Sequence, residues 1–413
     1  MIKKTMLQKA IFIGLFMLSF AGCQKETPPT ILKTGMWRGN IEIQGQDLPF
    51  NFKVVKDKGR FEIDLINGKE YFSIDKVYLF GDSLAFNLHI FDIEIRAKIK
   101  NDSLVGTYTK NYAEGYVLPF YAVHGKNGRF DSMNAHHRFD GKWETYFTNQ
   151  DGKKSLSIGV FKSQDSVLTG TFLNTTGDYR YLDGYTNQDT MYLYSFDGNH
   201  LYKFKGVLEN DSLINGTYWS GKTGYKNFIS TRNDSIELPD PHTLTYLKEG
   251  YDKVSFKFKN IEGKDVSIDD PTYKNKVVVV QILGTWCPNC MDETRFLADW
   301  YKKNKDRGAE VIGLAYEIKP EFSYAKDRIK TMKSQMGVEY EVLVAGLSTT
   351  ESASASLPML NEVISFPTTI IIDKFGKVRQ IHTGFSGPAT GEYYDQYVKD
   401  FNQFMDELLE ETI

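Results

Sequence analysis

Two cysteines separated by two residues are the positions in this 413-residue sequence best suited to chemistry. Cys287 and Cys290 follow a β-branched, apolar run at 277–283, and a helical periodicity begins after them. The pair is therefore expected at the start of a helix, where free backbone N–H groups and the positive end of the helix dipole favour an anion. At such a place the pKa of a cysteine thiol can fall from about 8.5 to about 3.5–7.5. We expect Cys287 to attack a disulfide and Cys290 to resolve the resulting mixed disulfide.

A zinc site is the alternative use of such a pair, which would then supply half of a four-ligand set. The sequence contains three cysteines in all, so it has no second pair. Dithiol redox chemistry without a metal or other cofactor is the favoured interpretation. The formal net charge of −3 also argues against nucleic acid as a partner, because no basic face is in excess.

Glu293 is the candidate for proton exchange with the cysteines. Cys290, Glu293 and Leu297 are spaced at i, i+3 and i+7, which places them on one stripe of the helix. Glu293 should then be at least partly buried, and burial raises the pKa of a carboxyl group into a range useful for proton transfer. The alternative is an acidic residue present only because the first turn of a helix prefers acids.

The stretch 284–290, with Glu293 and the later run Phe366-Pro367-Thr368-Thr369, resembles the thioredoxin fold. More narrowly, residues 244–413 are similar to the TlpA/ResA-type thiol-disulfide oxidoreductases of the cell envelope. Gln281 favours this narrower resemblance, because it stands where thioredoxins carry a buried aspartate. The resemblance implies an α/β domain of thioredoxin fold for this part of the chain.

The same resemblance implies roles for residues around the cysteines. Glu293 matches the glutamate that the family places three residues after its second cysteine, and Pro367 matches a cis proline that lies against the pair. Trp286 and Phe366 would border a substrate groove, in which the backbone of Phe366 can pair with an extended segment. Residues 384–388 are expected to shape that groove. The alternative for Pro367 is an ordinary trans proline at the start of a strand.

Residues 1–22 have the pattern of a signal peptide: lysines, an apolar run at 10–20 and then small residues. The apolar run is shorter than the roughly 20 residues that span a bilayer. Phe20-Ala21-Gly22-Cys23 resembles the processing site of bacterial lipoproteins, where Cys23 would become the acylated first residue. The alternative is a cleaved signal followed by a stray cysteine. Acylation at Cys23 predicts a lipid-anchored protein of the cell envelope, facing the periplasm or the cell surface of a Gram-negative-type bacterium.

The rest of the chain divides by composition into four parts. Residues 23–34 predict a tether, 35–126 a first β module, 127–237 a second β module and 238–413 a thioredoxin-like domain of the TlpA/AhpC-TSA redoxin type. Short alternating runs with Asn-Gly and Asp-Gly turns indicate antiparallel β structure throughout the two modules. The expected fold class is thus multidomain, with two all-β modules, each a small barrel or sandwich, before an α/β thioredoxin fold.

The two β modules repeat one pattern. The segment 101–108 matches 210–218, and Gly35-Met36-Trp37 matches Gly141-Lys142-Trp143. This predicts two copies of one fold, which we interpret as spacers or partner-docking modules in preference to ligand cups. His136 and His137 in the connection are expected to be exposed and not part of a metal site.

Within the C-terminal domain the periodicity predicts a definite order of elements. It comprises a hairpin within 254–268, strands at 310–315 and 339–344, a helix at 321–336, a mostly helical stretch at 352–364, strands at 368–372 and 377–383, and a closing helix at 392–409.

The leading functional hypothesis is a thiol-disulfide oxidoreductase that exchanges disulfides with envelope proteins, by resemblance as a reductant. It would receive electrons from a thiol donor in the envelope. A thioredoxin-fold peroxidase is a rival, but such enzymes carry a threonine three residues before the reactive cysteine, where this chain has Gly284. A copper chaperone would need three residues between the cysteines. A binding lipoprotein that works through its β modules is the rival from a different class.

Overall fold

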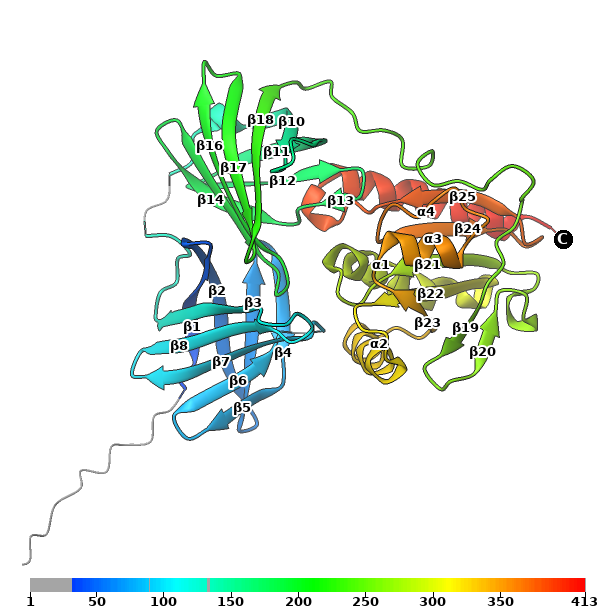
Figure 1. The fold of residues 1–413 in the computed structure, drawn as a ribbon, viewed down its shortest axis with the longest axis horizontal. Helices are drawn as coiled ribbons and strands as arrows, with labels where there is room; N and C mark the ends of the chain where they lie inside the picture. Colours follow the sequence, from blue (N-terminus) through cyan, green and yellow to red (C-terminus); the bar gives the residue numbers. More distant parts are fainter. Residues whose placement is uncertain (1–31, 89, 132–133, 413) are drawn as a thin grey trace, which may run out of the picture.

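The computed structural model describes residues 32–88, 90–131 and 134–412. Two β modules are followed by an α/β domain that lies beside them (Figure 1). The expected signal peptide, Cys23 and most of the expected tether lie outside the described residues. None of the helices in the described part of the chain has the length and apolar character needed to cross a membrane.

The first β module is an antiparallel meander whose last strand returns to pair with its first. Its nine-stranded sheet runs β4-β3-β2-β1-β9-β8-β7-β6-β5, so β4 and β5 form the two edges. Burial alternates along β1 and β7, as expected when one face of a sheet covers a core and the other meets solvent. The strands are β1 (Gly35–Ile43), β2 (Gln46–Asp57), β3 (Arg60–Asn67), β4 (Glu70–Ile74), β5 (Val77–Phe80), β6 (Ser83–Asn87), β7 (Ile93–Lys100), β8 (Ser103–Lys110) and β9 (Val117–His124).

The second β module follows the same meander and closes on itself. Pairing of β11 with β12 completes a barrel, and the two-residue strand β13 pairs antiparallel with the end of β12. Aromatic rings fill the interior; the centroids of Phe172 and Phe204, for example, lie 4.9 Å apart. A short 3-10 turn, η1 (His137–Phe139), precedes β10 (Gly141–Thr148), β11 (Lys154–Gln164), β12 (Val167–Asn174), β13 (Gly177–Asp178), β14 (Leu182–Asn187), β15 (Thr190–Phe196), β16 (Leu201–Glu209), β17 (Leu213–Ser220) and β18 (Gly224–Arg232).

The repeat seen in the sequence has a structural counterpart. Trp37 and Trp143 occupy the same place on the first strand of each module, and both are fully buried. Each indole N–H donates to the carbonyl four residues earlier, Trp37 to Lys33 at 3.0 Å and Trp143 to Phe139 at 2.8 Å. The repeated tryptophan therefore fixes the entry of the chain into each meander.

The C-terminal domain is a seven-stranded mixed sheet in the order β20-β19-β23-β22-β21-β24-β25. Strands β21, β22 and β23 are parallel, and every residue of β21 is buried, as its β-branched run predicts. The elements are β19 (Lys257–Asn260), β20 (Asp265–Ser267), η2 (Pro271–Tyr273), β21 (Val277–Leu283), α1 (Pro288–Asn304), η3 (Lys305–Arg307), β22 (Ala309–Glu317), α2 (Phe322–Met336), β23 (Glu341–Leu347), α3 (Thr350–Ser356), β24 (Thr368–Ile372), β25 (Val378–Thr383), η4 (Pro388–Thr390) and α4 (Glu392–Glu410). The expected fold class, two all-β modules before a thioredoxin-like domain, is confirmed.

One expected element differs. The helix expected over 352–364 ends at Ser356, because Leu357 precedes Pro358 and a residue before proline is disfavoured in the α region. Leu357 accordingly adopts φ −125° and ψ 65°. The following residues still bury apolar side chains, Leu360 and Val363 among them. The apolar residues in this stretch therefore belong to a buried loop and not to a helix.

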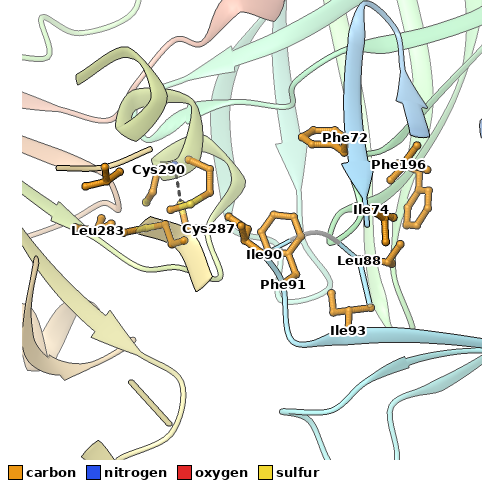
Figure 2. Packing of buried hydrophobic residues seen from close by; sticks show 14 of the residues in the cluster. Phe72, Ile74, Leu88, Ile90, Phe91, Ile93, Phe196, Leu283, Cys287 and Cys290 are labelled. Atoms are coloured by element: carbon orange, nitrogen blue, oxygen red, sulfur yellow. Dashed lines mark hydrogen bonds between the residues drawn. The ribbon is translucent and has the colours of Figure 1, made fainter. Parts of the chain in front are cut away.

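The β modules pack against each other and against the α/β domain. Phe196, at the end of β15, inserts into the core of the first module, with its ring centroid 4.3 Å from that of Phe50. Figure 2 shows Ile90 and Phe91, from the connection between β6 and β7, between that core and Cys287. The second module is therefore more than a spacer, and both modules take part in the surroundings of the cysteine pair.

Candidate active site

The cysteine pair lies at the junction of β21 and α1, as its sequence context predicts. Cys287 is the N-cap of α1, with extended backbone angles, and the Cys290 N–H donates to its Sγ at 3.2 Å. Pro288 takes the first helical position, where its missing N–H costs nothing. Cys287 is 7% exposed and Cys290 is fully buried, so an incoming group can reach only the first sulfur.

The loop before β24 lies against Cys287. The Phe366–Pro367 peptide bond is cis, and the Cys287 thiol donates to the Phe366 carbonyl at 3.4 Å. Trp286 packs edge-on against Phe366, with ring centroids 5.7 Å apart, and its indole N–H donates to the Tyr316 carbonyl. The structure thus places Trp286, Phe366 and Pro367 beside Cys287.

Glu293 lies behind the cysteines in the interior of the domain. It is fully buried, accepting from Gln281 Nε2 at 2.8 Å and from the Thr369 hydroxyl at 2.6 Å. Burial raises the pKa of the Glu293 carboxyl to about 7, although these two hydrogen bonds act in the opposite direction. Gln281 also donates to the Cys290 carbonyl at 3.3 Å, so it links Glu293 to the turn that carries the second sulfur.

Cys290 needs help to become a nucleophile. Burial raises the pKa of the Cys290 thiol well above its usual value, and the neighbouring Cys287 and Glu293 add to the rise. A buried thiol of this kind attacks only once a proton acceptor is at hand. Glu293, with its pKa near neutrality, is the carboxyl group suited to that task.

Glu317, at the end of β22, was missed by the sequence analysis. It is buried and accepts from the Thr285 backbone N–H at 3.0 Å and from the Thr285 hydroxyl at 2.8 Å. Burial raises the pKa of the Glu317 carboxyl to about 7. An acidic residue directly after the apolar run 311–316 was the available signal, and its hydrogen bonds hold the turn before the cysteines.

Arg180 of the second β module reaches the same helix, and no local pattern indicated it. Its guanidinium donates to the Pro288 carbonyl at 2.8 Å and pairs with Asp292 on α1. It also pairs with Glu70 of the first module at 2.5 Å and with Asp197 at 3.1 Å. One buried arginine therefore joins both β modules to the first turn of the cysteine-bearing helix.

A cavity of about 290 Å³ remains in front of Cys287. The cysteine turn and Phe366 form one side of it, and the second module forms the other, with His200, Tyr202 and Tyr218 among its lining residues. His200 stacks on Tyr202 at 4.6 Å and is held by Asp197 at 3.0 Å. The space next to the reactive sulfur is thus shared between two domains.

In the part of the chain that the structure describes, no group of three or more His, Cys, Asp or Glu side chains is placed to hold a metal ion. His136 and His137 are exposed, as expected.

A mixed sheet whose parallel strand β21 delivers a cysteine pair to the start of a helix, opposite a cis proline, defines a thioredoxin-like dithiol domain. The profile of the Redoxin family matches residues 252–397. "Thiol-disulfide oxidoreductase ResA" of Bacillus thuringiensis subsp. konkukian (strain 97-27) is 29% identical over 179 residues, which cover 43% of this chain and 86% of the relative. The protein of the same name from Bacillus subtilis (strain 168) is 28% identical over 138 residues, covering 33% and 69%.

Solved structures match a similar share of this chain. A putative protein disulfide isomerase from Bacteroides thetaiotaomicron covers 40% of this chain and 93% of its own, with 20% identity and a TM-score of 0.30. The family match and the ResA relatives assign the C-terminal region to the Redoxin family and the enzyme to the thiol-disulfide oxidoreductases. The expected resemblance is confirmed.

Proposed function

We propose that this protein is a lipid-anchored reductase of disulfides in the cell envelope, working through Cys287 and Cys290. The observation that carries the proposal is the arrangement of the pair. Cys287 caps α1 beside Phe366 and Pro367, and its Sγ accepts from the Cys290 backbone N–H at 3.2 Å. Glu293 is fully buried on the same helix. Accessible sulfur, resolving sulfur and proton acceptor are thus arranged from the surface inward.

The proposed cycle transfers two electrons to the substrate. The Cys287 thiolate attacks one sulfur of the substrate disulfide, forming a mixed disulfide and releasing the other sulfur as a thiolate. Cys290, after giving its proton to Glu293, attacks the Cys287 sulfur, which releases the second substrate thiolate and leaves a Cys287–Cys290 disulfide. The two protons of the original dithiol end on the substrate thiols. An envelope thiol donor then reduces the enzyme disulfide by the reverse exchange.

Anchoring is proposed from the sequence at Cys23. An acylated first residue carrying several chains meets the requirement of two signals for stable membrane attachment. Replacing Cys23 by serine should move the protein from the membrane fraction to the soluble fraction of cells. Continued sedimentation of C23S with membranes would overturn this part of the proposal.

Trapping tests the exchange chemistry. In the Cys290→Ser variant the mixed disulfide on Cys287 cannot be resolved, so partners should accumulate as adducts that a reductant releases. The double variant C287S/C290S is the matched control and should trap nothing. Equal recovery from the single and double variants would show that Cys287 does not exchange disulfides with cell partners.

The direction of electron flow is tested by equilibration with glutathione buffers. A reductant should have a midpoint potential more negative than the roughly −180 mV of protein disulfide isomerase. A value near −120 mV, typical of a strong oxidant, would contradict the proposed direction while leaving the exchange chemistry intact.

A further inference from the structure

A segment of the second β module, residues 174–180, lies where the thioredoxin-like domain would receive an extended substrate. This covering segment contains the turn after β12 and the short strand β13, which reaches toward α1 and α4 (Figure 1). The Ser365 hydroxyl donates to the Thr176 carbonyl at 3.0 Å. A Cβ added at Gly384 would lie 2.9 Å from the Thr175 carbonyl oxygen, so the two backbones touch. The covering segment therefore runs beside the loop that holds Pro367.

The next residues of the covering segment are fixed to the cysteine turn itself. Asn289, the second residue between the cysteines, donates from its side chain to the Asp178 carbonyl at 3.0 Å. The Gly387 N–H donates to the Asp178 carboxylate at 2.8 Å. Gly177 has φ +143°, and a Cβ there would come within 2.5 Å of the Asn289 amide. The covering segment is thus clamped between the cysteine turn and the loop 384–388, both of which border the expected substrate groove.

Arg180 secures the end of the covering segment. It is buried, has φ 60° and pairs with Asp292, Glu70 and Asp197. Removing one partner of a buried ion pair leaves uncompensated charge at a large free-energy cost, so such contacts resist opening. Outside the covering segment, Asn199 in the turn between β15 and β16 also ties the second module to the cysteine turn, donating from its side chain to the Trp286 carbonyl at 2.7 Å.

The covering segment restricts what can approach Cys287. An extended polypeptide that paired with Phe366 would need the space beside Ser365 that Thr176 already fills. What remains is the cavity of about 290 Å³, whose second wall carries polar groups such as His200 and Tyr202. We expect a narrow polar group to enter that space more readily than a folded domain that carries its disulfide on a rigid surface.

We propose that residues 174–180 determine substrate specificity by occupying part of the substrate groove, so that the enzyme reduces disulfides on slender polar groups in preference to disulfides in folded proteins. This inference rests on the proposed disulfide reductase activity. The chemistry it selects is a disulfide with one small polar partner, which can come from a low-molecular-weight thiol or from an unstructured polypeptide end.

The test compares three substrates of the 413-residue protein, with dithiothreitol as electron donor. Oxidised glutathione and a glutathionylated unstructured peptide are the slender substrates and distinguish the two sources, and insulin is the folded one. The measured quantity is the kcat/KM for insulin divided by that for each slender substrate. This ratio is unaffected by the fraction of protein that folds, because misfolded molecules lower every rate equally.

Arg180→Met should free the covering segment, and Asn199→Ala, which removes a neutral group, should loosen the contact of the second module with the Trp286 carbonyl beside it. We expect the ratio to rise by about tenfold in R180M, well within what breaking a buried ion pair can release, and by a smaller factor in N199A. Arg129→Met is the matched control. Arg129 is also buried and pairs with Asp183, and it donates to the Pro49 carbonyl, so its described partners lie within the β modules. R129M should leave the ratio unchanged.

The outcomes separate this inference from the proposed function. An unchanged ratio in both R180M and N199A, or an equal rise in R129M, would overturn the specificity role of the covering segment. Wild-type protein that reduces insulin as readily as glutathione would overturn it as well. Wild-type protein that reduces none of the three substrates would instead refute the reductase activity on which the inference rests.

Discussion

Glu293 is fully buried, although a glutamate on a helix is ordinarily exposed to solvent. The sequence stripe predicted its burial, and the structure shows the carboxyl enclosed by Gln281 and Thr369 with a pKa of about 7. Burial also raises the pKa of the Cys290 thiol, so we propose Glu293 as the acceptor of the Cys290 proton near neutral pH.

Replacing Glu293 by glutamine should slow the resolving step. A positioned general base contributes about 10²–10⁴-fold, so we expect the rate of mixed-disulfide resolution at pH 7 to fall by about 10². The inflection near pH 7 in that rate should disappear. Single-turnover quenching at a series of pH values measures both quantities.

Glu317→Gln is the control for this prediction, since Glu317 is also buried and its carboxyl also has a pKa of about 7. The inflection should persist in E317Q, because Glu317 bonds the turn at Thr285. If the inflection were lost in E317Q and kept in E293Q, Glu317 and not Glu293 would be the group that accepts the proton.

Glu293 also predicts a pH dependence of stability. Its pKa is raised from 4.5 to about 7 in the folded state, so between those values the native protein binds more protons than the unfolded chain. The free energy of unfolding therefore falls as pH rises through this window, by up to about 3 kcal/mol from this group. Urea denaturation at pH 5 and pH 8 should show a smaller loss of stability in E293Q than in wild type. An equal loss in both proteins would contradict the assigned pKa.

At the scale of elements, the turn from β21 into α1 depends on close packing of its glycine. A Cβ at Gly284 would lie 2.2 Å from Nε1 of Trp286, the indole that donates to the Tyr316 carbonyl. The threonine that a peroxidase carries at this position would therefore displace the tryptophan that borders the groove.

Gly284→Ala should destabilise the C-terminal domain by about 1–3 kcal/mol, the usual cost of overpacking. Tryptophan fluorescence should shift as the indole moves, and denaturant titration gives the loss of stability. Gly313→Ala in β22 is the control, because a Cβ there would lie no closer than 3.1 Å to the side-chain methyl groups of Leu283 and Val342. A larger effect at Gly313 than at Gly284 would contradict this account of the turn.

For the whole molecule, the two β modules behave as one support for the redox domain. Phe196 belongs to the second module but packs inside the first, against Phe50 and Tyr108. The Phe196 N–H also donates to the side chain of Asn67, a fully buried residue of the first module. Separation of the modules would expose this aromatic contact and a buried polar group together.

Phe196→Ala should cost about 3–5 kcal/mol and uncouple the two modules. Limited proteolysis should then cut the connection between them, and calorimetry should show separate transitions. Phe172→Ala, within the core of the second module, should lower stability without new cleavage between modules. Cleavage at the same rate in wild type and F196A would show that Phe196 does not hold the modules together.

The sequence by itself determined the features that depend on neighbours along the chain. The cysteine pair at the start of a helix, the buried stripe that includes Glu293 and the alternation of the β strands all arise from local periods of 3.6 or 2 residues. The resemblance to known redox domains added the cis proline, which local pattern alone left open. Predicted domain boundaries and the lipid anchor stay predictions.

Only the tertiary structure decided what faces Cys287 from the other domains. Arg180 and Asp292 are 112 positions apart, and Thr176 and Ser365 are 189 apart. Contacts at such separation leave no periodic trace, because they depend on how separately folded parts of the chain pack and not on which residues are adjacent in sequence. The local sequence pattern therefore predicted the reactive sulfur. The surroundings of that sulfur are set by the packing of the β modules around it, which the sequence pattern did not predict.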